Sequence, residues 1–281
     1  MIPFDFDYYK PTTIEEAVRL YKELDNNDKD PLYYGGGTEI ITMARMNTIY
    51  TQAVIDLKGI PECNTLEFQN DYLVIGAGVT LTRIAESKLF PLLGKAVGRI
   101  ADHTTQGKIT LGGNIAGTIL YREAVLPLLL SDSKVLIAGE NGQRTVPFAE
   151  VFQERLRLAK SEFLVRIIID KRYTTAPFIH VKRTRSEKID YPLVSVTALT
   201  YEDQIRIAFS GVCAFPFRSH EVESGLNNDE LPYCDRINFA LECLPAPFMN
   251  DISGSAKYRE FILRQTLLNI LEKPPKENPN D

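Results

Sequence analysis

The chain has 281 residues, 44% of them hydrophobic and 25% charged, and its 37 acidic and 32 basic side chains give a formal net charge of −5. This length accommodates two domains with separate cores, and the acidic balance argues against nucleic acid or a membrane surface as partner. The four cysteines and three histidines lack the spacing of zinc or iron–sulfur sites. Because neither a signal peptide nor an apolar run of membrane-spanning length is found, the sequence predicts a cytoplasmic protein.

The first 57 residues predict a β-α-β-α-β unit. Aromatic residues alternating with polar ones over residues 4–8 indicate a strand, and a capping box that begins at Thr13 starts a helix. Residues 32–34 predict a short strand that leads directly into a glycine stretch, Gly35-Gly36-Gly37-Thr38-Glu39-Ile40. A helix over residues 39–46 and a strand over residues 54–57 complete the unit.

The next unit, residues 58–172, is predicted to contain two hairpins, a series of short helices and a closing strand. The hairpins span residues 66–75 and 135–147 and turn at Asn70-Asp71 and Asn141-Gly142. Helices are expected over residues 82–87, 92–101 and 122–130. A second glycine stretch, Thr110-Leu111-Gly112-Gly113-Asn114-Ile115, lies between the last two of these helices, at another expected helix start. A strand over residues 163–169 closes the unit.

The last third of the chain predicts a small antiparallel sheet followed by helices. Strands are expected over residues 179–184, 194–199 and 204–210, and helices over residues 219–225, 235–244 and 255–271. The remaining tail is rich in proline, asparagine and charge, which is typical of a disordered end.

The two glycine stretches are the strongest candidates for a ligand site. Glycine lets the backbone approach a ligand closely, and consecutive N–H groups form a concavity that holds a phosphate or pyrophosphate. On the residues alone, an anionic ligand and tight backbone packing explain the two stretches equally well. The P-loop, the Rossmann fingerprint and the nucleophile elbow are all excluded, because their required residues are missing.

Six motifs in order resemble those of one family. The first glycine stretch is similar to A-G-G-T-D-L, residues 54–62 to I-D-L-x-x-I-x-E, and residues 110–116 to T-I-G-G-N-I-A. Residues 75–80, 211–218 and 254–259 resemble I-G-A-x-x-T, G-x-x-x-x-P-x-R and G-S-A-x-Y-R. The chain, from about Phe4 to Arg259, thus resembles the FAD-binding medium subunit of the molybdenum hydroxylases, the family of xanthine dehydrogenase and carbon monoxide dehydrogenase.

The resemblance implies an α+β fold in two domains. Residues 1–172 would form a two-part FAD-binding domain of the vanillyl-alcohol-oxidase (PCMH) type, with subdomains of about 1–57 and 58–172. Residues 173–273 would form a small α+β domain with a three-stranded antiparallel sheet and helices, of the carbon monoxide dehydrogenase flavoprotein C-terminal type. Residues 274–281 would be a disordered tail.

The resemblance also implies an FAD site. Amides of residues 35–40 and 112–114 would bind the pyrophosphate, Lys182 would lie near the flavin, where a cation stabilises its reduced form, and Glu123 replaces a family Asp that reaches cofactor hydroxyls. No catalytic residue or metal ligand is assigned. The cofactor-binding candidates are Gly35, Gly36, Gly37, Thr38, Glu39, Ile40, Ile100, Ala101, Thr110, Gly112, Gly113, Asn114, Gly117, Glu123, Phe163, Leu164 and Lys182.

The implied function is electron transfer within a complex. Electrons would pass from the 2Fe–2S clusters of a small subunit through FAD to NAD or another acceptor, while a molybdopterin-binding large subunit hydroxylates the substrate, in a heterotrimer or its dimer. The chain departs from the family at Glu39, at Glu123 and at Thr105-Gln106-Gly107, where I-R-N is usual. Two alternatives stay open: a free-standing FAD oxidoreductase of the same fold, and a structural subunit without FAD.

Overall fold

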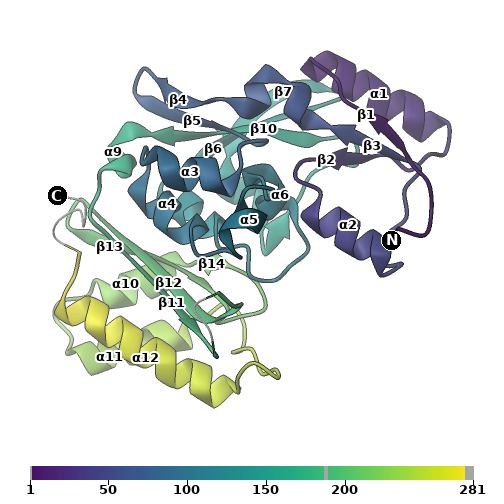
Figure 1. Cartoon of the computed structure of the whole chain (residues 1–281). Coiled ribbons are helices and arrows are strands. Elements are labelled where there is room, and N and C mark those ends of the chain that lie inside the picture. The colour runs from purple at the N-terminus through teal and green to yellow at the C-terminus, as the bar shows by residue number, and fades with distance from the viewer. Residues whose placement is uncertain (1, 187–188, 276–281) are drawn as a thin grey trace.

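The computed structural model describes residues 2–186 and 189–275, and its strands form three main sheets (Figure 1). The first sheet is parallel, in the order β1-β3-β2. Thr13 caps its first helix by accepting a hydrogen bond from the Glu16 amide at 3.1 Å. The predicted β-α-β-α-β order is confirmed by β1 (Asp7–Tyr9), α1 (Ile14–Asn26), β2 (Leu32–Tyr34), α2 (Thr38–Arg45) and β3 (Ala53–Asp56).

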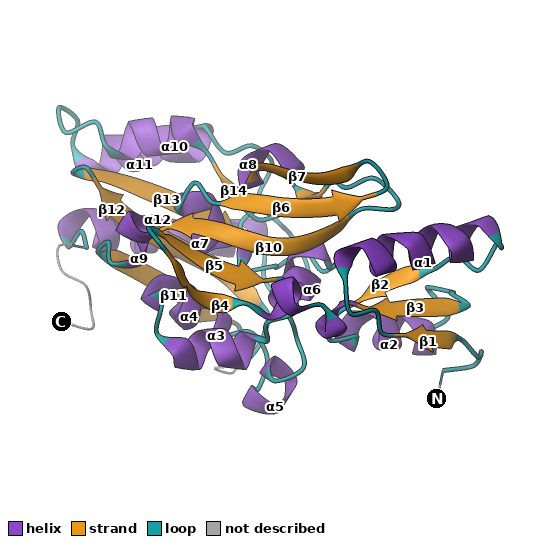
Figure 2. Cartoon of the chain, turned by 90° about the horizontal axis from the view of Figure 1, so that it is seen from above, coloured by secondary structure: helices purple, strands orange, loops and turns teal. Residues whose placement is uncertain are grey.

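The second sheet is antiparallel and contains both predicted hairpins. Its order is β4 (Leu66–Gln69), β5 (Tyr72–Gly76), β10 (Phe163–Asp170), β6 (Lys134–Gly139) and β7 (Gly142–Pro147). The largest hydrophobic core lies between this sheet and the short helices that follow β5 (Figure 2). These helices are α3 (Leu81–Ser87), α4 (Pro91–Val97), α5 (His103–Gln106), α6 (Leu111–Ala116) and α7 (Val125–Leu130).

The helix predicted over residues 92–101 is shorter than expected. It ends at Val97, because Gly98 occupies the C-cap and Ala101 adopts a left-handed backbone with φ of 56°. The four-residue helix α5 then follows, which the sequence did not predict. The α7 helix likewise begins three residues after the predicted start. Short connecting elements complete this region: η1 (Leu57–Gly59), η2 (Pro61–Asn64), α8 (Phe148–Val151), β8 (Phe152–Gln153), β9 (Arg155–Leu156) and α9 (Lys171–Thr174).

The third sheet is antiparallel, in the order β11 (Phe178–Thr184), β12 (Pro192–Tyr201), β13 (Gln204–Ser210) and β14 (Phe217–Arg218). The two-residue β14 is an addition to the three predicted strands, because so short a strand carries no visible alternation. Three helices cover the outer face and enclose a separate core: α10 (His220–Leu226), α11 (Tyr233–Glu242) and α12 (Ala256–Glu272). Of the predicted disordered tail, residues 276–281 lie outside the described residues.

The inner face of the third sheet packs against α4 and α7 (Figure 1). Phe178, Leu199 and Ala208 of this sheet belong to the largest core, and polar side chains add hydrogen bonds across the contact. Arg218 donates to Leu129 O at 2.9 Å and to Asp132 at 2.8 Å, and Ser210 Oγ donates to Tyr121 O at 2.8 Å. Arg206 also pairs with Asp132. Hydrogen bonds of fixed direction therefore set how this sheet sits on the rest of the chain. In residues 2–186 and 189–275, no helix combines the length and hydrophobicity needed to cross a membrane.

Candidate functional site

The two glycine stretches meet in the folded chain. We call residues 35–40 the first glycine loop and residues 110–115 the second glycine loop. A Cβ atom on Gly36 would lie 1.7 Å from the carbonyl oxygen of Lys108, and one on Gly35 would lie 2.5 Å from Thr110 Oγ1. Only glycine permits so close an approach of the two backbones. The predicted pairing of the stretches at one place is therefore observed, and tight packing accounts for part of their glycine content.

The first glycine loop presents free amide groups. It joins β2 to α2, and Gly37 occupies the N-cap of α2 with φ of 71° and no side-chain cap. Within the described part of the chain, none of the amides of residues 36–40 donates a hydrogen bond. Unsatisfied amides at a helix N-terminus, where the helix dipole is positive, attract a phosphate or another anion.

The second glycine loop differs from the prediction in which atoms it offers. Gly112 N donates to Ala77 O at 2.8 Å, Gly113 N to Thr110 Oγ1 at 3.1 Å, and Asn114 N to Thr110 O at 2.9 Å. These amides, which the sequence suggested as donors to a pyrophosphate, already have acceptors within the fold. Instead, the buried Asn114 Oδ1 is left without a hydrogen-bond partner among the described residues. A buried polar atom without a partner is costly unless a ligand or water satisfies it.

Glu39 links the first glycine loop to the segment that follows α6. Its carboxylate accepts hydrogen bonds from the amide and the hydroxyl of Thr118, both at 2.6 Å. A Cβ atom on Gly117 would lie 2.6 Å from Glu39 Oε2, so a larger residue there would push the Glu39 carboxylate aside. The Glu39 carboxylate thus fixes α2 against the segment that follows α6.

Glu123 and Lys182 engage each other across the contact between the third sheet and α7. Lys182 Nζ lies 2.6 Å from Glu123 Oε2, and the two side chains are 2% and 4% exposed. Lys182 also donates to Arg99 O at 2.9 Å, and Ser195 Oγ donates to the second oxygen of Glu123. Both side chains are therefore committed to a structural ion pair, which neutralises the lysine charge expected near the cofactor.

The four predicted apolar contacts fall into two groups. Phe163 lies in β10 with its ring centroid 4.6 Å from that of Tyr33, two residues before the first glycine loop. Its neighbour Leu164 belongs to the largest core. Ile100 packs against that core, and Ala101 O accepts a hydrogen bond from Gln106 at 3.1 Å. Through Arg99, this second group lies beside Lys182.

A lysine at the first glycine loop was not predicted. Lys58 Nζ donates to the carbonyl oxygen of Gly35 and to Asp56 Oδ1, the latter at 2.8 Å, and lies 4.8 Å from the centroid of the Tyr34 ring. Asp56 also accepts a hydrogen bond from the Tyr8 hydroxyl, which raises the pKa of Tyr8 to about 12. The I-D-L-type motif contained Asp56 and Lys58, but spacing alone gave these two residues no role.

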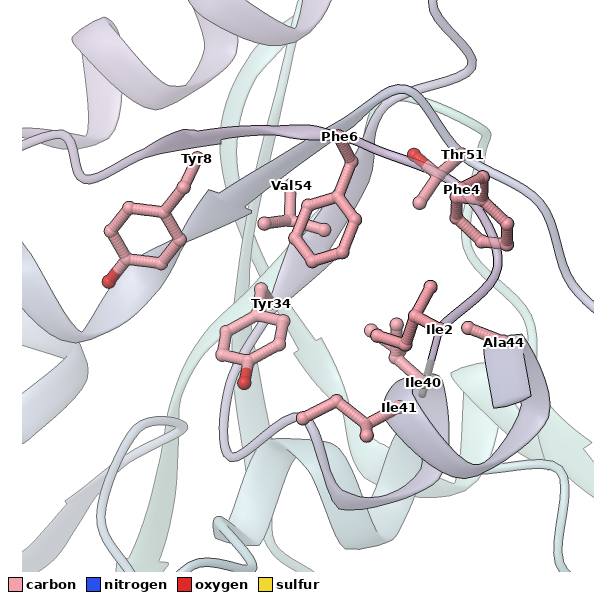
Figure 3. Close-up of a pocket in the computed structure, with 10 residues that line it drawn as sticks. All are labelled: Ile2, Phe4, Phe6, Tyr8, Tyr34, Ile40, Ile41, Ala44, Thr51 and Val54. Carbon is pink, nitrogen blue, oxygen red and sulfur yellow. The ribbon is translucent and has the colours of Figure 1, made fainter.

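Tyr8 and Tyr34 lie together at one end of an apolar cavity of about 200 Å³ (Figure 3). Strand β1, the segment before it and helix α2 supply most of the lining. The cavity borders the first glycine loop through Tyr34 and Ile40, so the loop has an apolar neighbour on this side.

The chain matches a known family and several characterised relatives. Residues 4–171 match the family described as FAD binding domain in molybdopterin dehydrogenase. Caffeine dehydrogenase subunit beta of Pseudomonas sp. (strain CBB1) is 26% identical over 80% of this chain and 79% of that protein. The carbon monoxide dehydrogenase medium chain of Hydrogenophaga pseudoflava is 29% identical over 52% of each. A solved carbon monoxide dehydrogenase structure from Hydrogenophaga pseudoflava superimposes with a TM-score of 0.83, at 25% identity, over 97% of this chain and 98% of that one.

Proposed function

Because the chain belongs to the family of FAD-binding domains in molybdopterin dehydrogenases, we propose that it is the subunit that carries electrons out of a molybdenum hydroxylase. Electrons reach its FAD from iron–sulfur clusters of a partner subunit and leave to NAD or another acceptor. The relatives described above are named as a subunit and a medium chain of dehydrogenases, which supports assignment of this chain as one part of a larger enzyme.

One observation carries the assignment of the cofactor site. The amides of residues 36–40 have no acceptor among the described residues, and Gly35 packs against Thr110 of the second glycine loop, which also holds the buried, unpartnered Asn114 Oδ1. Several amide donors and a helix N-terminus suit the two negative charges of a diphosphate, and the glycines leave room for it. The residues present therefore fit FAD. The first loop supplies the donors, Thr110, Gly112 and Gly113 give the second loop its shape, and Gly117 lies against the Glu39 carboxylate.

The remaining candidates position the cofactor. When bound, FAD supplies the redox chemistry, because its ring accepts and releases electrons singly or in pairs. Phe163 packs against Tyr33 beside the first glycine loop, while Leu164 belongs to the largest core and Ile100 packs against it. The Glu123–Lys182 pair holds the third sheet against α7 and so fixes the geometry around the site without contributing an acid or a base.

The proposed partners are a molybdopterin-binding large subunit and a 2Fe–2S small subunit, in a heterotrimer or its dimer in the cytoplasm. The test is to purify the full chain, with an affinity tag, from its native cells and to measure flavin, molybdenum and iron in what co-purifies. The proposal predicts FAD, molybdenum and iron in one complex. FAD on a chain without either metal would instead favour a free-standing oxidoreductase, and a metal-containing complex without FAD would favour a structural subunit.

A further inference from the structure

Lys58 is fixed in place by a buried carboxylate. Asp56 ends β3, and its Oδ1 accepts hydrogen bonds from both Lys58 N at 2.9 Å and Lys58 Nζ at 2.8 Å. Its other oxygen accepts the Tyr8 hydroxyl. Burial acts to raise the pKa of Asp56, but the hydrogen bonds from Lys58 and Tyr8 hold it below its usual range. Asp56 is therefore ionised, and it restrains the lysine ammonium.

The local backbone supports the same arrangement. Asp56 caps the 3-10 helix η1, which turns the chain directly after β3 and brings Lys58 toward the first glycine loop. A Cβ atom on Gly59 would lie 2.3 Å from Pro11 O, so this turn requires glycine. The position of Lys58 is thus set by both its side-chain partners and its backbone.

The contact between Lys58 and Gly35 orients one peptide group of the loop. The described chain contains no cis peptide bond, and in a trans peptide the carbonyl and the following N–H point in opposite directions. Anchoring Gly35 O to Lys58 therefore directs the Gly36 N–H away from the lysine. That N–H has no acceptor among residues 2–186 and 189–275. Three consecutive glycines would otherwise leave this peptide free to rotate.

We propose that Lys58 is a positioning residue for the diphosphate of the cofactor. By holding the carbonyl of Gly35, it presents the Gly36 amide to the diphosphate. Asp56 and Tyr8 hold the lysine side chain in this position. Because Asp56 neutralises the ammonium charge, the contribution of Lys58 is orientation rather than long-range attraction. This inference rests on the proposed function, since it assumes that the first glycine loop holds the FAD diphosphate.

The test compares ligands that contain a diphosphate with one that lacks it. The full chain and its Lys58→Met, Lys58→Arg and Lys134→Met variants are freed of cofactor and titrated with FAD, ADP and riboflavin. The exposed Lys134 is the matched control for loss of a positive charge. Lys58→Met should weaken FAD and ADP binding about tenfold, the value of one hydrogen bond to a charged group. Riboflavin binding should be unchanged, Lys58→Arg should recover most of the loss, and Lys134→Met should behave as wild type.

Other outcomes separate this inference from the proposed function. If the wild type binds FAD and the Lys58→Met variant binds it equally well, the inference is overturned and the proposed function is not. A Lys58→Met variant whose affinity for riboflavin falls as much as its affinity for FAD would also overturn the inference, because the effect would then not depend on the diphosphate. A wild-type chain that binds neither FAD nor ADP would overturn the proposed function as well. Should Lys58→Met fail to fold, Tyr8→Phe removes one hydrogen bond to Asp56 and leaves the loop itself unchanged. A smaller loss of affinity for FAD and ADP is then expected, again with riboflavin binding unchanged.

Discussion

At the scale of single residues, His180 shows most clearly how folding changes a side chain. It lies in β11 with 7% of its surface exposed, and Nδ1 is 2.9 Å from Thr197 Oγ1. Burial, followed by the nearby positive charges of Arg99 and Lys182, lowers the pKa of His180 from 6.5 to about 3. The folded chain therefore keeps this imidazole neutral at all but strongly acidic pH.

This pKa difference makes folding stability depend on pH. The unfolded chain binds a proton at His180 below about pH 6.5, whereas the folded chain does so only near pH 3, so stability falls as the pH drops from 6.5 toward 3. Between pH 7 and pH 5 the loss from this residue is about 2 kcal/mol. Urea unfolding at the two pH values should show that wild type loses about 2 kcal/mol more than His180→Gln. Equal losses would mean that His180 is protonated in the folded state.

The sequence predicted part of the site at the residue scale. Gly35, Gly36 and Gly112 were singled out because motif spacing and glycine content are visible in a linear chain. The hydrogen bond from Gly112 N to Ala77 O was not predictable, because it depends on β5 and α6 lying side by side. Lys58 was missed for the same reason, since its acceptor Gly35 lies 23 positions away in the sequence.

At the scale of elements, the inner face of β11 to β13 is the feature that joins the chain together. Alternate residues of β11 place His180 and Lys182 on the face that meets α4 and α7. Their polar side chains occupy positions that a simple alternation rule would assign to an apolar core. The rule predicted the strands correctly, but it could not predict that the partner surface would carry Glu123.

Removing one partner of the Glu123–Lys182 pair should cost far more stability than removing both. Glu123→Gln leaves the buried Lys182 charge without a counterion and is expected to cost about 3 to 5 kcal/mol of unfolding free energy. In the double variant Glu123→Gln/Lys182→Met no unpaired charge remains, and most of this loss should be recovered. Urea unfolding of wild type, both single variants and the double variant measures the coupling energy. Additive effects of the two substitutions would contradict a direct interaction.

The elements predicted least well are short helices and strands, whose formation depends on tertiary contacts. The parallel first sheet and both hairpins of the second sheet follow from periodicity and turn residues. By contrast, α5 has four residues and β14 has two, which is too short for any pattern to register. The predicted domain boundary at residue 172 falls within α9 (Lys171–Thr174) and stays a prediction.

At the scale of the whole molecule, the chain has three parts, each built on one of the three main sheets. The parallel first sheet delivers the first glycine loop, the helices over the second sheet deliver the second loop, and the third sheet is bound to α4 and α7 beside them (Figure 2). Family membership supplies the identity of the cofactor, and the free amides of the first glycine loop are the place proposed for its diphosphate.

The measurement that tests this account most directly is the FAD content of the purified full chain. An absorption spectrum, followed by release and quantification of the flavin, should show about one FAD per chain, as expected for a non-covalently held cofactor. The Gly36→Ala variant should lose it, because the added Cβ would lie 1.7 Å from Lys108 O. A colourless wild-type chain that takes up no added FAD would contradict the account. So would a Gly36→Ala variant that folds and binds FAD as wild type does.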